Sequence, residues 1–92
     1  MEHIAMIAGD GWLTTPSLPS AAALFRIDVW KPRKGDLVAD GVLTAESLSA
    51  GPNDGRATLT LTSGESLEIE LSDIHDQGAA FTVLDPVYPK LL

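Results

Sequence analysis

The sequence of 92 residues predicts an all-β fold, either a small barrel or a two-sheet sandwich of about six short antiparallel strands. The strongest evidence is residues 57–71, ATLTLTSGESLEIEL, where apolar and polar residues alternate with the period of half-buried strands. Further short apolar segments recur along the chain between segments that contain Gly or Pro. We expect a single domain over residues 1–92, with at most one short helical turn.

The alternating segment also predicts how its two strands pair. Leu59 and Leu67 can share the buried face only if an odd number of residues joins the strands. A three-residue loop, residues 62–64, meets this condition. It places Gly64 where a type I turn followed by a G1 bulge requires a positive φ. We therefore expect Leu59 to lie opposite Leu67.

The N-terminal segment predicts a strand, a turn and an extended loop. Residues 3–8, HIAMIA, are apolar and predict the first strand. The sequence GDG at residues 9–11 predicts a turn after it, and residues 12–15 can continue the sheet. Pro16 and Pro19 then predict an extended loop, because each proline also disfavours helix at the residue before it.

The next segments predict one helical turn and two strands. Ser20 followed by three alanines predicts a capped helical turn over residues 20–24. Residues 25–31 alternate cleanly and predict a strand. Residues 37–48 predict another, with a bulge or bend at residues 40–41.

The C-terminal half predicts two loops, a strand and a tail. Residues 49–56, SAGPNDGR, carry the strongest loop signal in the chain. After the hairpin, residues 73–78 predict a turn and residues 79–84 a last strand. Residues 85–92 contain two prolines and predict an extended tail that ends in the exposed pair Leu91–Leu92.

The composition excludes several classes of protein. The chain has no cysteine, so it can form neither disulfides nor thiolate metal sites. No apolar run approaches the ~20 residues that span a bilayer, and the N-terminus lacks the pattern of a secretory signal. We therefore expect a soluble, cytoplasmic protein.

The charge is distributed unevenly along the chain. The net charge is −7. Residues 1–35 contribute three carboxylates and four cations, a balance of +1, whereas residues 36–92 contribute ten carboxylates and two cations, a balance of −8. An acidic surface disfavours nucleic acid, which requires clustered cations. It favours a protein partner with a basic surface.

No motif predicts catalysis, a cofactor or a metal site. The chain lacks a Gly-x-Ser-x-Gly elbow and a glycine-rich loop that opens a helix. His75 lies in the predicted turn between Asp73 and Asp76, but these three residues alone are too few to hold an ion. The sequence therefore predicts a protein that is not an enzyme and that needs no cofactor or metal.

The preferred functional hypothesis is a protein-interaction or structural module. Its acidic face would consist of glutamates on the exposed side of the hairpin, and two tryptophans would anchor an apolar contact. An unpaired edge strand could also join a second copy of the chain. The residues predicted to bind the partner are Trp12, Trp30, Glu65, Glu68 and Glu70.

The alternative hypothesis is a receptor for a nucleotide, a cyclic dinucleotide or another small ligand. Arg26, Arg33 and Lys34 lie near Trp30 in the sequence, and cations beside an aromatic ring can bind phosphate or stack on a base. This alternative would use a basic cluster of three residues in place of the acidic face.

Residues 56–86 contain a hairpin followed by DIHDQGAAFTVL, and this segment resembles the middle of PilZ domains, which bind cyclic di-GMP. The family motif Asp-x-Ser-x-x-Gly would fall on Asp73, His75 and Gly78, with histidine in place of serine. The paired arginines of the family have no counterpart at the matching spacing. The resemblance implies a shared strand-turn-strand shape, and no ligand is carried over from it.

Overall fold

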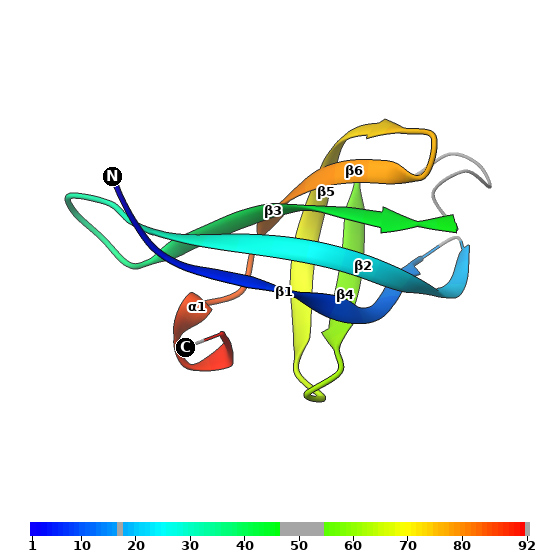
Figure 1. Ribbon diagram of the computed structural model, residues 1–92, viewed down its shortest axis with the longest axis horizontal. Coiled ribbons are helices and arrows are strands. Elements are labelled where there is room, and N and C mark those ends of the chain that lie inside the picture. The colour runs from blue at the N-terminus through cyan, green and yellow to red at the C-terminus, as the bar shows by residue number, and fades with distance from the viewer. Residues whose placement is uncertain (17, 47–54, 92) are drawn as a thin grey trace.

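The computed structural model is a closed antiparallel barrel of six strands (Figure 1) and describes residues 1–16, 18–46 and 55–91. Around the barrel the strands follow the order β1-β2-β3-β6-β5-β4, and β4 closes onto β1. The all-β prediction is confirmed, and of the two predicted architectures the barrel is the one that forms. The strands are β1 (Glu2–Thr15), β2 (Leu18–Lys31), β3 (Val38–Ala45), β4 (Arg56–Leu61), β5 (Ser66–His75) and β6 (Gly78–Val83).

One apolar core fills the barrel. Every strand contributes alternate residues to it, as the two-residue period of a strand requires. The intervening residues point outward and form what we call the outer face. The largest fully buried side chains are Phe81, Leu13, Ile27, Leu59, Leu67, Ile69 and Val29.

The β4–β5 hairpin has the predicted register. Leu59 lies opposite Leu67. In the loop, the Gly64 N–H donates to the Leu61 carbonyl at 2.9 Å, and the Leu61 N–H donates to the Glu65 carbonyl at 2.8 Å. Gly64 has φ +99°, the positive value that the three-residue loop requires. The alternation of the sequence therefore predicted both strands and the loop between them.

The predicted turn at residues 9–11 is wrong, because β1 continues through it as a strand. Gly11 lies opposite Leu61 where β1 closes on β4. A Cβ at Gly11 would lie 2.1 Å from the Thr60 carbonyl oxygen. The glycine therefore allows β1 and β4 to approach each other closely at this position, and the chain does not turn there.

The predicted helical turn over residues 20–24 is also wrong, because these residues belong to β2. They pair with β1 on one side, and Ala23 is buried in the core. The loop predicted around the two prolines is correspondingly shorter, since β2 begins at Leu18. Pairing with neighbouring strands overrides the helix propensity of the alanines.

The strand β3 is regular where a bulge was expected. Residues 40–41 pair in sequence with both β2 and β6. A Cβ at Gly41 would lie 2.1 Å from the Arg26 carbonyl oxygen and 2.8 Å from Cζ of Phe81. This glycine therefore makes room for a core ring and a neighbouring backbone. Residues 47–54, which include most of the loop predicted at 49–56, lie outside the described residues.

The turn before β6 is shorter than predicted. β5 extends to His75, so the chain turns at residues 76–77. Asp73 and Asp76 have positive φ values of 48° and 51°, and the β5–β6 pairing shifts between residues 72 and 75. The predicted turn residues therefore form an irregular strand end and a tight turn.

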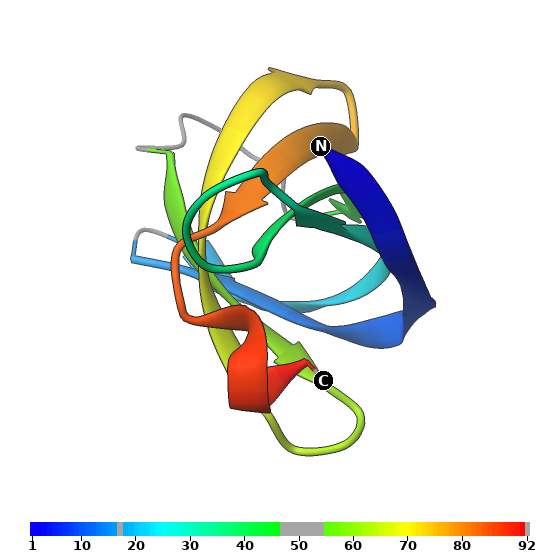
Figure 2. The same cartoon turned by 90° about the vertical axis from the view of Figure 1, so that its left-hand side faces the viewer.

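The prediction of an extended C-terminal tail is wrong, because the tail curls under one end of the barrel (Figure 2). It contains a single short turn, α1 (Val87–Lys90), that is interrupted by the extended φ and ψ of Tyr88 (−100° and 131°). Val87 is buried in the core, and Leu91 is half-buried against it rather than exposed, whereas Leu92 lies outside the described residues. The apolar residues of the tail thus close one end of the core.

Candidate functional site

The structure separates the two tryptophans that were predicted to act together. Both side chains lie on the outer face of the β1–β2 pair, but Trp12 is opposite Ala22 whereas Trp30 is opposite His3. Positions 3 and 12 of β1 are about 30 Å apart at ~3.3 Å per residue. The two rings therefore cannot anchor one small contact.

Trp30 is held by its neighbours. Its Nε1 donates a hydrogen bond to Asp40 Oδ1 at 3.1 Å, and its ring packs edge-on against His3 with centroids 4.8 Å apart. His3 Nε2 in turn lies 2.9 Å from Asp28 Oδ1. These contacts order the outer face at the N-terminal end of β1 and leave Trp30 half-buried.

The three predicted glutamates are exposed, but they belong to two parts of the hairpin. Glu65 lies at the loop, whereas Glu68 and Glu70 lie on the outer face of β5. Glu68 accepts a hydrogen bond from the Thr58 hydroxyl at 2.8 Å. Because β4 lies between β5 and β1, Trp12 shares this side of the barrel with Glu68.

Three large apolar side chains form an exposed stripe across the outer face of β1, β2 and β3. They are Trp12, Leu24 and Val42, exposed by 54%, 64% and 56%, and we call them the apolar band. Trp12 is opposite Ala22, and Leu24 is the next residue of β2 that points outward after Ala22. Leu24 is opposite Thr44, and Val42 is the adjacent outward-pointing residue of β3. The three side chains therefore follow a diagonal of neighbouring positions.

Of the three residues in the apolar band, Trp12 was predicted from the sequence, whereas Leu24 and Val42 were not. Leu24 was assigned to a helical turn, and Val42 follows the glycine at which a bulge was expected. The signal that could have found them is an apolar residue at a position that alternation assigns to solvent. Such residues mark interaction surfaces when several gather in one patch.

Two hollows with acidic linings flank the apolar band. One of about 250 Å³ includes Asp10, Leu24 and Glu46 in its lining. The other, of about 550 Å³, lies over small residues of β3 and β6 beside Val42 and contains the carboxylates Asp28 and Asp40 together with one cation, Arg26. The band is thus an apolar ridge between two concave regions that carry negative charge.

The basic residues of the alternative hypothesis are not gathered into one cluster. Arg26 lies in the middle of β2, where its Nη2 is 3.6 Å from Asp28 Oδ1. Arg33 and Lys34 lie in the loop after β2. The five steps along β2 from Arg26 to its last residue, Lys31, span about 17 Å. An anion could therefore meet two of these cations but not all three at once.

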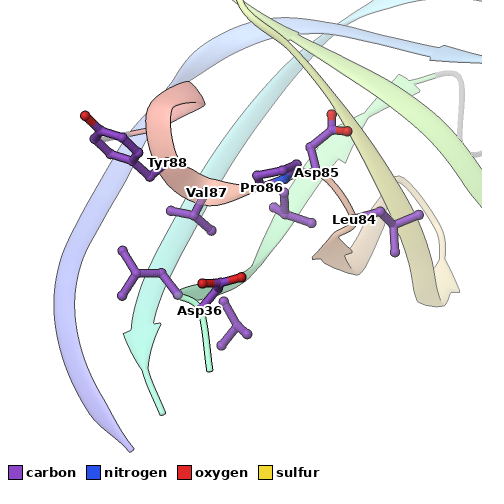
Figure 3. A pocket seen from close by; sticks show the side chains of 9 residues that line it. Asp36, Leu84, Asp85, Pro86, Val87 and Tyr88 are labelled. Carbon is purple, nitrogen blue, oxygen red and sulfur yellow. The ribbon is translucent and has the colours of Figure 1, made fainter. Parts of the chain in front are cut away.

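A further hollow of about 500 Å³ lies at the end of the barrel that the tail covers. Figure 3 shows Asp36 facing the tail residues Pro86 and Val87, with the Tyr88 ring directed away from them. The lining is mainly apolar, with two carboxylates. It consists of Asp36, Leu37, Val38, Val83, Leu84, Asp85, Pro86, Val87 and Tyr88.

Asp85 fastens the tail to β5. Its Oδ2 accepts a hydrogen bond from the Glu68 N–H at 2.8 Å and another from Lys90 Nζ at 3.1 Å. The bond from Glu68 lowers the pKa of the Asp85 carboxyl below its ordinary value, burial opposes this shift, and Lys90 adds to it. Asp85 is therefore charged throughout the neutral range.

We expect Asp85→Asn to be less stable than the wild type at pH 7 and the difference to shrink at low pH. A carboxylate with a lowered folded-state pKa stabilises the fold above its unfolded-state pKa, and this contribution disappears as pH falls below about 4. Urea unfolding from pH 7 to pH 2 measures the difference. Asp36→Asn, which removes an exposed carboxylate from the same hollow, is the control. A difference as large at pH 2 as at pH 7 would contradict the role of the charge.

The structure shows neither a metal cluster nor a membrane-spanning helix in the part of the chain that it describes. No group of three or more His, Cys, Asp or Glu side chains among these residues could hold a metal ion. No helix in them has the length and apolar character needed to cross a membrane.

Comparison with protein-family models, curated proteins and solved structures finds no match to this chain. The likeness of residues 56–86 to PilZ domains therefore remains one of a short strand-turn-strand segment.

Proposed function

We propose that this protein is a non-catalytic interaction module that binds a protein partner through the apolar band. The partner would present an apolar surface bordered by basic side chains. The single observation that carries this proposal is the exposure of Trp12, Leu24 and Val42 on one continuous face. Three large apolar side chains exposed on neighbouring positions lose contact with water when a partner covers them.

The charge around the band supports a basic partner. Asp10 and Glu46 line the hollow beside Leu24, and Asp28 and Asp40 line the hollow beside Val42. The net charge of −7 would add long-range attraction to a cationic surface. Glu68 and Glu70 would contribute to this attraction from β5 rather than by direct contact with the same patch.

We further propose a cytoplasmic location and no enzymatic activity as part of this function. The alternative, a nucleotide receptor, has less support from the geometry because Arg26 is separated from Arg33 and Lys34. A second copy of the chain would use a different surface, the free edge of β1.

We expect Leu24→Asp to reduce partner capture by at least about tenfold, because buried hot-spot residues commonly contribute 2 kcal/mol or more. The measurement is affinity capture with quantitative mass spectrometry, comparing the recovery of each protein by the wild type and by the variant. Thr62→Asp adds the same charge at the exposed β4–β5 loop and is the matched control.

The proposal requires that the proteins lost from Leu24→Asp be retained by Thr62→Asp and carry basic surfaces. A second arm reverses Glu68 and Glu70 to lysine, which should weaken the salt dependence of capture while leaving the apolar contact intact. Equal recovery of every protein by Leu24→Asp and by the wild type would rule out the band as the binding surface.

A further inference from the structure

The first half of β1 has one unpaired edge. Along Glu2–Asp10 this strand pairs with β2 on one side only, because its pairing with β4 is confined to residues 11–14. In the described parts of the chain, no strand pairs with the other side. Figure 2 shows this half of β1 at the outside of the molecule. Its outward-facing N–H and C=O groups can therefore accept another strand.

This edge lacks most features that prevent strands from pairing. Residues 2–10, EHIAMIAGD, contain no lysine, arginine or proline, and their two carboxylates lie at the ends. The one irregularity, between His3 and Ala5, lies near the N-terminus, and the strand pairs regularly with β2 from Ala5 onward. Met6 is 51% exposed at the middle of the edge.

We propose that this edge pairs with the same edge of a second copy, antiparallel and with its two-fold axis at Met6. In this register the segment is complementary to itself in size. Ala5 meets Ile7 of the other copy, and Met6 meets its own equivalent. Ile4 meets Ala8, and the irregularity between His3 and Ala5 ends the regular pairing beyond Ile4. A large side chain thus faces a small one at each position except the flexible methionine pair.

The register brings carboxylates near each other at both ends of the edge, and neighbouring cations offset their repulsion. Each Asp10 falls beside the N-terminal end of the other copy, where Glu2 lies opposite Lys31 on β2. Arg33 lines the same hollow as Glu2 and Lys31. The two cations offset the approach of the two carboxylates. Residues 1–35 carry a balance of +1, so this is the part of an acidic molecule where two copies repel each other least.

The dimer is independent of the proposed function. Val42 lies on β3, and Leu24 lies on β2 opposite Asp10, four residues or about 13 Å along β1 from Met6. A dimer built at Met6 would leave both side chains exposed and would present two apolar bands. If the chain does not dimerise, the apolar band can still bind a partner. If the apolar band binds no partner, the free edge of β1 can still form the dimer.

Sedimentation equilibrium of the full chain tests this proposal. We expect the mass to rise from 9.7 kDa toward twice that value as the protein concentration increases from micromolar to millimolar. Met6→Lys should weaken dimerisation by about tenfold or more, because like charges directly opposite each other on paired strands repel. The matched control is Val42→Lys, which replaces an exposed apolar residue of β3, a strand that does not pair with β1, and should dimerise as the wild type does.

Cross-linking gives a second readout that does not depend on affinity. The chain has no cysteine, so Met6→Cys introduces a single thiol at the expected two-fold axis. Opposed side chains of paired strands have Cβ atoms about 5 Å apart, and mild oxidation should therefore join two copies far faster than in Leu24→Cys. The proposal is wrong if the wild type stays monomeric or if the two cysteine variants cross-link equally fast. The same results are expected if a different protein, rather than a second copy, occupies the edge.

Discussion

Gly11→Ala is expected to open the seam between β1 and β4 and to destabilise the protein by about 3 kcal/mol or more. The added Cβ would lie 2.1 Å from the Thr60 carbonyl oxygen, so backbone rather than a flexible side chain must move. The seam consists of only four residue pairs, from Gly11–Leu61 to Thr14–Thr58. Such a loss is a large part of the roughly 5–15 kcal/mol that stabilises a typical domain.

Gly9→Ala is the matched control for this prediction. The two glycines occur in the same GDG sequence, but a Cβ at Gly9 would meet only the Phe25 ring at 3.6 Å, an ordinary contact. We expect this variant to be as stable as the wild type or slightly more stable, because alanine restricts the unfolded chain. Urea unfolding and amide hydrogen exchange at Leu13 and Leu59 measure both effects. Equal stability of the two variants would show that the seam tolerates a side chain.

Phe81→Ala is expected to cost about 3–5 kcal/mol, the usual range for truncation of a buried phenylalanine. The ring is 2% exposed and lies over Gly41, between β3 and β5. The chain has neither disulfides nor a metal cluster among its described residues to compensate for this loss. We therefore expect this variant to lose a large part of the free energy of unfolding.

Thr82→Ala separates this core effect from a general effect on β6. Thr82 is the next residue of the strand and points outward, so we expect a change within about 0.5 kcal/mol. The same urea titration should give a lower midpoint for Phe81→Ala with an unchanged slope. Similar losses in the two variants would contradict the importance of the buried ring.

The sequence predicted those elements whose pairing is local. In the β4–β5 hairpin, alternation, the charges on one face and Gly64 all agree, so strand, loop and register could be derived together. The hairpin joins residues close in sequence, and its turn geometry fixes which residues lie opposite each other. Such agreement among local signals makes a segment predictable.

The errors arose where distant segments decide the local structure. Gly11 looks like a turn residue until β4 is placed beside it, because only the close approach of Thr60 explains the glycine. The alanines of residues 21–23 favour a helix until β1 pairs with all three of them and β3 pairs with Ala23. The tail likewise appeared extended because nothing local predicts that Val87 enters the core.

The same limit applies to the candidate site. Alternation correctly placed Glu68 and Glu70 on an exposed face, and exposure can be derived from one strand alone. Which exposed residues lie next to each other cannot be derived from one strand, because it depends on the register between strands. The diagonal from Trp12 through Leu24 to Val42 exists only once β1, β2 and β3 are aligned.

The short seam between β1 and β4 has a consequence for how quickly the protein folds. It joins residues 11–14 to residues 58–61, so the intervening chain must lose its freedom before these hydrogen bonds can form. The β1–β2 and β4–β5 hairpins need no such long loop and can assemble first. We therefore expect the pairing of β1 with β4, which closes the barrel, to be the slow step of folding. Its timescale should be milliseconds to seconds, as in other chains rich in contacts between residues distant in sequence. Until that event, two preassembled ribbons would remain open and available to other molecules.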